Sequence, residues 1–426
     1  MQRRTLERSA IALALLLITA LGAEMRLTAS QSKYPEHRHQ QSDVHRYYVS
    51  PAESWLAGRG WETDYRQNFI PPPLQGVFVA TAKMLAPSAS DGTLRRTQAW
   101  IGSLAILLAF WIGCEIGGPF VGLFAAVFFA FNPDVVRSAE SLLTETHYFV
   151  LLFGFLAVLL CALRIDKSWL FAAAGALLGW TSLLKPFPAP LAILLPAYFY
   201  ARARTPASLL RGALLFAGFA LVISPWIARN FIRYDAIHPI STNAGTALAM
   251  GNHLALDAHA TIYWEQIQQT GAWRSEAVER PFRGKRDPDG KLMWNEQDVA
   301  YRTHALAYIA TNPLHFARNY SIKLYNTFRH PLGAPAGPWQ GPHLFRVALL
   351  ALGFLGLVAF AATERAKPAW VIVAILGYFT AFTALFHITR SGRLNLPVKV
   401  LLGFFAAWGV VAAARWARSR IATTRP

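Results

Sequence analysis

The stretch SDVHRYYVSPAESWLAGRGWETDYRQNFIPPPL, residues 42–74, is the part of the chain around which the rest is organised. It follows the first hydrophobic segment and is too polar to enter a bilayer. It contains an acid, Asp43, then aromatic residues, then a run of prolines. Most of the remaining sequence consists of apolar runs, which would hold this stretch as a loop at one face of a membrane. An acid fixed there, beside aromatic and basic groups, suits chemistry on a polar substrate that is carried by a lipid.

Composition predicts an all-α polytopic membrane protein. Hydrophobic residues make up 54% of the chain and charged residues 15%, against roughly 25% charged residues in soluble domains. The net charge of +18 is one feature of nucleic-acid-binding proteins, but these basic residues lie between apolar runs, which the positive-inside rule explains better. We therefore expect the lipid bilayer, and not nucleic acid, as a partner. Cys114 and Cys161 both lie within apolar runs and are expected to be free thiols.

The apolar runs predict about ten membrane spans. We place them at residues 10–23, 93–116, 120–131, 147–163, 169–184, 186–200, 214–226, 344–362, 368–386 and 396–413. The first run is short, so a cleaved signal peptide competes with the retained helix that we favour. Residues 74–85 are apolar but too short to span, and we expect them to form a helix along the membrane interface.

The basic residues between the spans predict the topology. With residues 93–116 running inward, the basic groups around Arg164, Arg204, Arg365 and Arg415 all fall on the cytoplasmic side. Both chain ends then lie in the cytoplasm, and the loops at 29–93 and 132–145 share the outer face.

We divide the chain into three parts on these grounds. Residues 1–228 form an N-terminal transmembrane module with two outer loops. Residues 229–342 are largely polar and are expected to form a small outer domain with helices. Residues 343–426 form the C-terminal spans and a cytoplasmic tail.

The order of several short motifs resembles the GT-C superfamily of glycosyltransferases. The first outer loop has Asp43, Tyr47, Ala52, Leu56 and Gly58, followed by Pro72-Pro73-Leu74. Its pattern is similar to bacterial family 39 proteins, which are related to protein O-mannosyltransferases and the lipid A aminoarabinose transferase. Further matches are Arg95, Asn132-Pro133 with Glu145, Leu184-Lys185-Pro186, PWIARN at 225–230, ISTNAG at 240–245 and Arg393-x-Asn395-x-Pro397. The likeness covers most of the chain except about residues 254–294.

The resemblance implies a GT-C-like bundle that moves a sugar from a polyprenyl-phosphate donor to an acceptor, with inversion at the sugar carbon. A carboxylate must then accept a proton from the acceptor hydroxyl, and cations must offset the charge that grows on the phosphate. Asp43 suits the first role, and Glu145 is a second candidate acid. The candidate phosphate-binding cations are Lys185, Arg95, Arg229, Arg390 and Arg393, and the candidate substrate-loop residues are Tyr47, Tyr65, Pro72 and Pro73.

The family commonly has Asp-Glu where this chain has Asp43-Val44, which leaves Asp43 as the single acid of that motif. No cofactor is expected, and a divalent metal stays an open alternative. The resemblance places the protein in the bacterial cytoplasmic membrane with its active face outside. The acceptor could be a lipid, a glycan or a protein, and the sugar is not determined by the sequence.

Several of these residues also have ordinary structural interpretations. Glu145 begins a helix, where it could cap the N-terminus together with Thr144. Lys185 could extend its ammonium to the interface, and Arg390 and Arg393 could contact lipid headgroups. Asp134 follows a proline and is interpreted as a turn acid.

A transporter or flippase for a lipid-linked sugar is the alternative function. Such proteins place polar groups and broken helices near the middle of the membrane, and here the Lys185-Pro186 break alone resembles that pattern.

Overall fold

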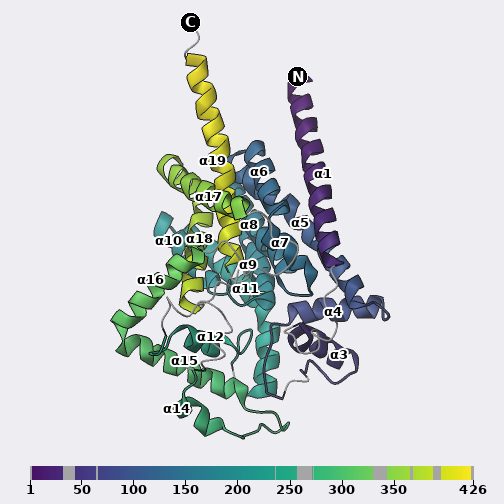
Figure 1. The fold of residues 1–426 in the computed structure, drawn as a ribbon, viewed down its shortest axis with the longest axis vertical. Helices are drawn as coiled ribbons and strands as arrows, with labels where there is room; N and C mark the ends of the chain where they lie inside the picture. Colours follow the sequence, from purple (N-terminus) through teal and green to yellow (C-terminus); the bar gives the residue numbers. More distant parts are fainter. Residues whose placement is uncertain are drawn as a thin grey trace.

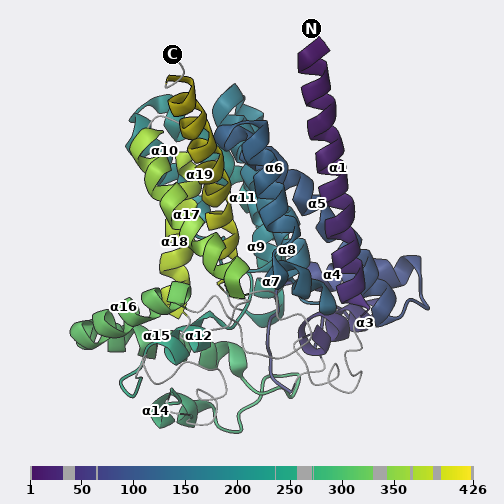
Figure 2. The ribbon, with the colours of Figure 1, turned by 45° about the horizontal axis from the view of Figure 1, so that its top comes forward.

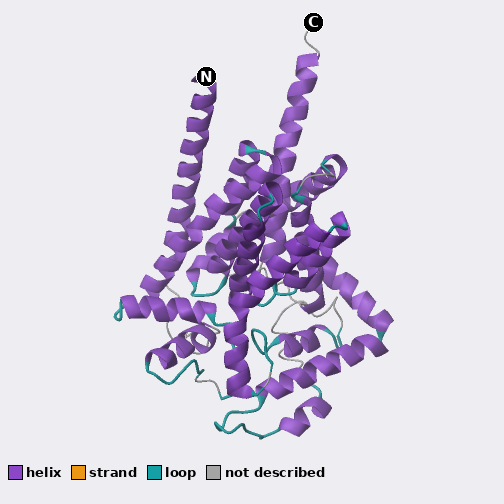
Figure 3. Ribbon diagram, turned by 180° about the vertical axis from the view of Figure 1, so that it is seen from behind, coloured by secondary structure: helices purple, strands orange, loops and turns teal. Residues whose placement is uncertain are grey.

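A computed structural model describes residues 2–31, 44–63, 66–235, 237–256, 271, 273–329, 343–364, 368–386 and 395–423. Helices dominate these residues, and no strand longer than an isolated bridge occurs among them (Figure 3). The protein is therefore all-helical in the part of the chain that the structure describes, as the composition predicts.

Each predicted span corresponds to a helix of the bundle. These helices are α1 (Gln2–Ser30), α5 (Asp91–Gly117), α6 (Pro119–Ala130), α8 (Glu145–Ile165), α9 (Ser168–Leu184), α10 (Leu191–Ala203), α11 (Pro206–Tyr234), α17 (His343–Thr363), α18 (Trp370–Phe386) and α19 (Leu396–Thr423). By length and composition, 6 of the described helices are apolar enough to cross a membrane, and α6 forms a further candidate with the short helix after it, at a bend of 49°. The remaining members, α9, α10 and α18, are shorter apolar helices.

The two chain ends lie at the same end of the bundle (Figures 1 and 2). Contacts at this end join the turns between helices: Arg164 pairs with Glu115 at 2.9 Å, and Arg211 with Asp166 at 2.6 Å. Arg415 of α19 donates to the carbonyl oxygen of Gly117. The predicted basic groups thus gather at one end, except for Arg365 and Lys367, which lie outside the described residues.

The opposite end carries the loops and the polar segment. The first outer loop contains η1 (His45–Val49), α3 (Ser50–Leu56) and α4 (Leu74–Leu85), and the second contains α7 (Pro133–Arg137) and η2 (Ser138–Glu140). The polar segment contains α12 (Ala244–Gly251), α14 (Glu276–Glu279), η3 (Arg280–Phe282), α15 (Trp294–Thr311) and α16 (Pro313–Arg329). Figure 2 shows α4, α15 and α16 lying across the direction of the bundle helices.

α12 is anchored to α15 by a buried carboxylate. Asp298 accepts hydrogen bonds from the backbone N–H groups of Gly245 and Thr246, at 3.1 and 2.7 Å. These are N–H groups of the first turn of α12, which have no partner within their own helix. The Thr246 hydroxyl donates to the same carboxylate. These hydrogen bonds hold α12 and α15 of the polar segment together.

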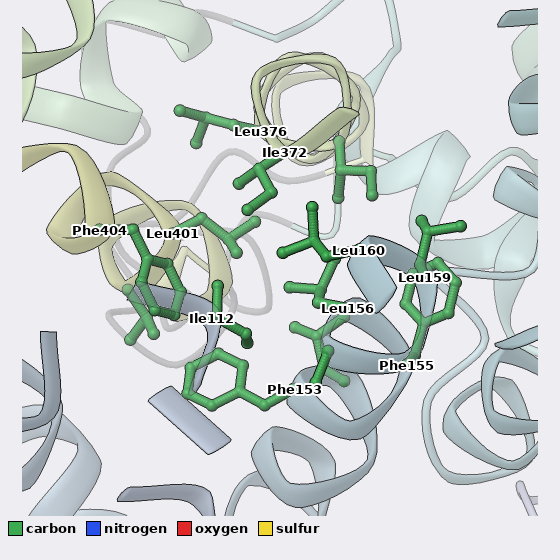
Figure 4. Close-up of a cluster of buried hydrophobic side chains, with 14 of the residues drawn as sticks. Ile112, Phe153, Phe155, Leu156, Leu159, Leu160, Ile372, Leu376, Leu401 and Phe404 are labelled. Carbon is green, nitrogen blue, oxygen red and sulfur yellow. The ribbon is translucent and has the colours of Figure 1, made fainter. Parts of the chain in front are cut away.

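A continuous apolar core joins α5, α8, α18 and α19. Figure 4 shows Phe153 and Leu156 of α8 facing Ile372 of α18 and Phe404 of α19. The backbones of α9 and α11 lie in close contact, because a Cβ added at Gly218 of α11 would lie 2.0 Å from the carbonyl oxygen of Ala172 in α9. Small residues at such crossings are typical of helices that pack within a bilayer.

α1 is held against α6 by a buried arginine. The Arg26 guanidinium donates to the carbonyl oxygens of Gly22, Phe129 and Ala130, at 2.8, 3.2 and 3.1 Å. Arg26 is 1% exposed. Because the last carbonyls of α6 have no partner within their helix, this side chain satisfies them and fixes α1 beside α6.

Candidate functional site

A buried ion pair joins the second outer loop to the turn between α9 and α10. Glu145 is the first residue of α8, and Lys185 follows the last residue of α9. The Lys185 Nζ donates to Glu145 Oε1 at 2.8 Å, and the two side chains are 9% and 3% exposed. The ammonium also faces the rings of Tyr148 and Phe187, 5.4 and 5.7 Å from their centroids. Both charged residues were predicted separately from the sequence, and the fold brings them together.

The ordinary interpretations of these two residues hold only in part: Glu145 is the acid in the first turn of α8, as an interaction with the helix dipole requires. Thr144, the residue that precedes α8, makes no side-chain capping hydrogen bond. The Lys185 ammonium is turned into the protein toward Glu145 instead of extending to the interface. A charged pair this well buried requires close geometry to offset the cost of removing both charges from water.

The break between α9 and α10 lies at an end of the bundle and not in its middle. Lys185 is level with Glu145 at the outer loops, whereas Asp166 before α9 pairs with Arg211 of α11 at the opposite end. Lys185 and Pro186 therefore do not form the mid-membrane helix break that is typical of transporters. They belong to a turn between two helices of the bundle.

A buried network of amides lies next to the ion pair. Gln75 of α4 donates to Gln98 Oε1 of α5 at 2.7 Å and to the carbonyl oxygen of Leu142 at 2.9 Å. Its own Oε1 lies 2.9 Å from His147 Nδ1, two residues after Glu145. This network was not predicted, although polar residues within the apolar stretches 74–85 and 93–116 were a visible signal. It fixes α4 and the second outer loop against the start of α8.

Arg95 holds the second outer loop by its backbone. Its Nη1 donates to the carbonyl oxygen of Glu140 at 3.3 Å, and Gln98, one turn further along α5, donates to that of Ser141 at 3.0 Å. Within the described residues, no contact joins Arg95 to Lys185 or Glu145. Its observed position is beside the loop that precedes Glu145.

Arg229 joins the first outer loop to α11. Its Nη2 donates to the carbonyl oxygen of Trp61 at 2.6 Å and lies 3.6 Å from Glu62 Oε1. Glu62 also pairs with Arg233 and Lys291, each at 3.0 Å. Desolvation would raise the pKa of Glu62, but the hydrogen bonds and charges of Lys291 and Arg233 together lower it. The described contacts therefore place Arg229 in a charged cluster that connects the first outer loop to α11 and to the polar segment.

Of the predicted substrate-loop residues, the structure describes Tyr47, Pro72 and Pro73. The ring of Tyr47 packs on that of Phe69, with centroids 4.7 Å apart. Pro73 is the residue immediately before α4, and Pro72 precedes it. Ile70, just before the prolines, exchanges hydrogen bonds with Thr242 of the polar segment: its N–H donates to the Thr242 hydroxyl, and its carbonyl accepts from the Thr242 N–H. The proline run is thus fixed at its start.

Four predicted site residues lie outside the described residues: Asp43, Tyr65, Arg390 and Arg393. Their roles stay predictions. The next residue after Asp43 is described, and Val44 is 4% exposed in a buried cluster that includes Leu142 of the second outer loop. Among the described residues, no group of three or more His, Cys, Asp or Glu side chains comes together as a metal site would require.

Comparison with known proteins supports the fold. No family model matches the chain, and no curated protein matches its sequence. Among solved structures, it is similar to the archaeal oligosaccharyltransferase AglB from Archaeoglobus fulgidus in complex with an inhibitory peptide and a dolichol-phosphate. That likeness has a TM-score of 0.52 and 14% identity, over 98% of this chain and 52% of that one. The Archaeoglobus fulgidus oligosaccharyltransferase tethered to an acceptor peptide containing the NVT sequon gives a TM-score of 0.55 and 14% identity, over 94% and 49%.

The chain therefore spans about half the length of these neighbours, 52% and 49%. Both are oligosaccharyltransferases of the GT-C superfamily. At this level of identity the likeness concerns the fold, and it agrees with the motif order in the sequence. The protein is an all-helical, multi-pass membrane protein with a GT-C-like fold.

Proposed function

We propose that the protein is a membrane glycosyltransferase that moves a sugar from a polyprenyl-phosphate donor to an acceptor at the outer face of a bacterial cytoplasmic membrane. The observation that carries this proposal is the buried Lys185–Glu145 pair, at the end of a GT-C-like bundle where both outer loops lie. The acceptor is a lipid, a glycan or a protein.

The reaction proposed is a single displacement with inversion. The acceptor oxygen forms a bond to the anomeric carbon of the sugar while the bond from that carbon to the phosphate oxygen breaks. Asp43 takes the proton of the acceptor hydroxyl, and polyprenyl phosphate leaves with the electron pair. The position of Val44 supports this assignment. Val44 directly follows Asp43 and packs in the same buried cluster as Leu142, which lies three residues before Glu145.

Lys185 is the proposed cation for the departing phosphate. An ammonium acts on phosphate as a compact point charge, and its surroundings of Tyr148 and Phe187 exclude water and strengthen its field. Glu145 holds the ammonium in place and balances its charge before the donor binds. We therefore treat Glu145 as a positioning residue, with a direct acid role as the alternative.

What the neighbours bind supports the choice of substrate class. One solved neighbour holds a dolichol-phosphate, and another is tethered to an acceptor peptide. Both partners of the proposed reaction, a lipid phosphate and an acceptor, thus have counterparts among proteins of this fold.

The test is turnover of a radiolabelled polyprenyl-phosphate sugar by the purified protein, with membrane extract as the source of acceptor. Asp43→Asn keeps the size of the side chain but removes the basic oxygen, so transfer should fall by about a hundredfold or more. Glu145→Gln should have a smaller effect, and activity should survive a chelator if a single carboxylate is the base. The matched control is Asp91→Asn, the same change at the first residue of α5.

An Asp43→Asn protein that transfers sugar at the parent rate would remove Asp43 from the mechanism. Loss of transfer in Glu145→Gln, with Asp43→Asn still active, would move the base to the second outer loop.

A further inference from the structure

The last helix of the polar segment, α16, turns its polar face toward the protein. The polar or charged side chains on this face are at most 8% exposed and recur every three or four residues: Asn319, Lys323, Asn326 and Thr327. Lys323 Nζ donates to the carbonyl oxygen of Gly251 in α12 at 2.8 Å and to Asn252 Oδ1 at 3.2 Å. An amphipathic helix at a water-exposed surface does the reverse and buries its apolar face.

The opposite face of α16 is exposed and largely uncharged. Its residues recur at the same helical spacing and are named here the α16 stripe: Leu314, Ala317, Arg318, Ser321 and Tyr325. Leu314 is 86% exposed and Tyr325 is 59% exposed. Leucine, tyrosine and arginine are residues that helices present to the surface of a membrane. The orientation of α16 is therefore that of a helix whose outer face meets lipid and not water.

α16 crosses the outer end of α18. The Tyr320 hydroxyl donates to the carbonyl oxygen of Ala381 at 3.1 Å, and Lys323 Nζ to that of Leu385 at 3.3 Å. Both carbonyls belong to the end of α18, whose last residue is Phe386. Figure 2 shows α16 running sideways away from this end of α18. The helix thus lies at the level where an apolar helix of the bundle ends, which is where the surface of a bilayer is expected.

The α16 stripe also continues the lipid-facing surface of α17. Phe328, which follows Tyr325 by three residues, packs its ring on that of Phe354 in α17, with centroids 4.9 Å apart. Phe354 is 40% exposed and shares a face of α17 with Leu355 and Val358, which are 69% and 68% exposed. Because α17 is one of the helices that are apolar enough to cross a membrane, this exposed face contacts lipid. An apolar surface therefore leads from the membrane-facing side of α17 onto α16.

We propose that the α16 stripe lies on the outer leaflet of the membrane, at the boundary between headgroups and acyl chains. Leu314 and Ala317 contact the acyl chains. Tyr325 lies at the level of the headgroups, and Arg318 donates to lipid phosphate oxygens. The occupant is the lipid surface, because the stripe is continuous with the lipid-facing side of α17 and because its charged member is basic, as anionic phosphates require. This contact holds the polar segment against the membrane.

The experiment locates the stripe in the full-length protein, reconstituted in nanodiscs of phosphatidylglycerol and phosphatidylethanolamine. A polarity-sensitive fluorophore is attached to Ala317→Cys in a background that carries Cys114→Ala and Cys161→Ala. The matched control is Ala277→Cys, the same change at an exposed alanine of α14, which lies away from the bundle in Figures 1 and 2. Lipids brominated near the headgroup end of the acyl chain should quench the fluorophore on Ala317→Cys and leave that on Ala277→Cys unchanged, since an interfacial helix enters the bilayer by only about 5–10 Å.

A substitution within the stripe tests the apolar contact separately. Leu314 is 86% exposed, so Leu314→Glu should leave the unfolding midpoint in detergent at the parent value. In nanodiscs, Leu314→Glu should remove most of the quenching on Ala317→Cys, because a carboxylate one turn away resists transfer from water into the acyl region. Leu314→Ile keeps the apolar surface and should retain the quenching of the parent.

Three outcomes would overturn the proposal. Weak quenching that is equal on Ala317→Cys and Ala277→Cys would show that the stripe faces water. Quenching that Leu314→Glu leaves unchanged would show that the fluorophore, and not the stripe, enters the lipid. A disulfide between two copies of unlabelled Ala317→Cys, without quenching of the labelled protein, would assign the stripe to a second copy of this chain. The readout is the position of α16, so it does not depend on whether the protein transfers sugar.

Discussion

Neutralising one member of the Lys185–Glu145 pair should destabilise the protein more than neutralising both. The nitrogen and oxygen are 2.8 Å apart, and the side chains are 9% and 3% exposed. Removal of one partner from such a pair typically costs about 3–5 kcal/mol, because it leaves a charge buried without its partner, whereas replacement of both can be nearly neutral. We expect about 3 kcal/mol for Lys185→Met or Glu145→Gln alone, and most of that loss to be recovered in the double variant.

The assay compares stability and catalysis in the same preparations. Unfolding is followed in detergent for the parent, the two single variants and the double variant, and transfer from the lipid donor is measured in parallel. The double variant should be close to the parent in stability yet inactive, because the proposed phosphate cation is missing. The control is the Arg211–Asp166 pair, at 2.6 Å but 31% and 59% exposed. Its loss should cost less than about 1 kcal/mol.

Two results would refute this reasoning. A double variant as unstable as the sum of the single variants would show that the charges of Lys185 and Glu145 do not depend on one another. A double variant that transfers sugar at the parent rate would exclude Lys185 from phosphate stabilisation and leave the pair with a structural role.

Three further predictions concern other parts of the protein. Arg26→Leu should lower the free energy of unfolding by about 2 kcal/mol or more, since it leaves carbonyls at the end of α6 without their donor. The unfolding free energy of Arg26→Lys, which keeps a donor, should lie between those of the parent and Arg26→Leu. An unfolding midpoint of Arg26→Leu equal to that of the parent would refute this role. Burial lowers the pKa of Lys323 in α16 from 10.5 to about 7. Between pH 7 and 10.5 the unfolded state therefore binds more protons than the folded state, and the free energy of unfolding should rise with pH. Lys323→Met should flatten that rise, and a pH profile identical to that of the parent would contradict the prediction. Cysteines introduced at Ser90 and Gly284 should react with an impermeant thiol reagent added outside the cell, and one at Thr205 should not; labelling at Thr205 alone would reverse the topology.

The bundle could be predicted from sequence because hydropathy is a local property. A run of apolar residues of sufficient length forms a helix in a bilayer whatever its neighbours, since no water is present to satisfy its backbone. The basic residues between runs then indicate which helix ends lie together, and Arg164, Arg211 and Arg415 are found at one end as predicted. The short run 74–85 was recognised as a lateral helix by its length alone.

The candidate site was predictable only in part. Lys185 and Glu145 were each identified from motif order, but nothing in the sequence indicated that they pair, because 40 residues separate them. Arg229 was proposed as a phosphate ligand, and the fold places it in the cluster around Glu62. That assignment depended on the path of the first outer loop, which no local pattern encodes.

By itself, the sequence determined the helical class, the positions of the apolar helices and the grouping of their basic ends, since each follows from the hydropathy and charge of neighbouring residues; of the ten predicted spans, α9, α10 and α18 are shorter apolar helices. Only the tertiary structure decided which charges are buried and which partner each one has. Arg346 lies in one of the last apolar runs, and the acid it pairs with, Asp134, lies 212 residues earlier in the second outer loop. The physical reason is that an ion pair depends on the distance between two side chains and on the water excluded around them, and both are set by how distant helices pack.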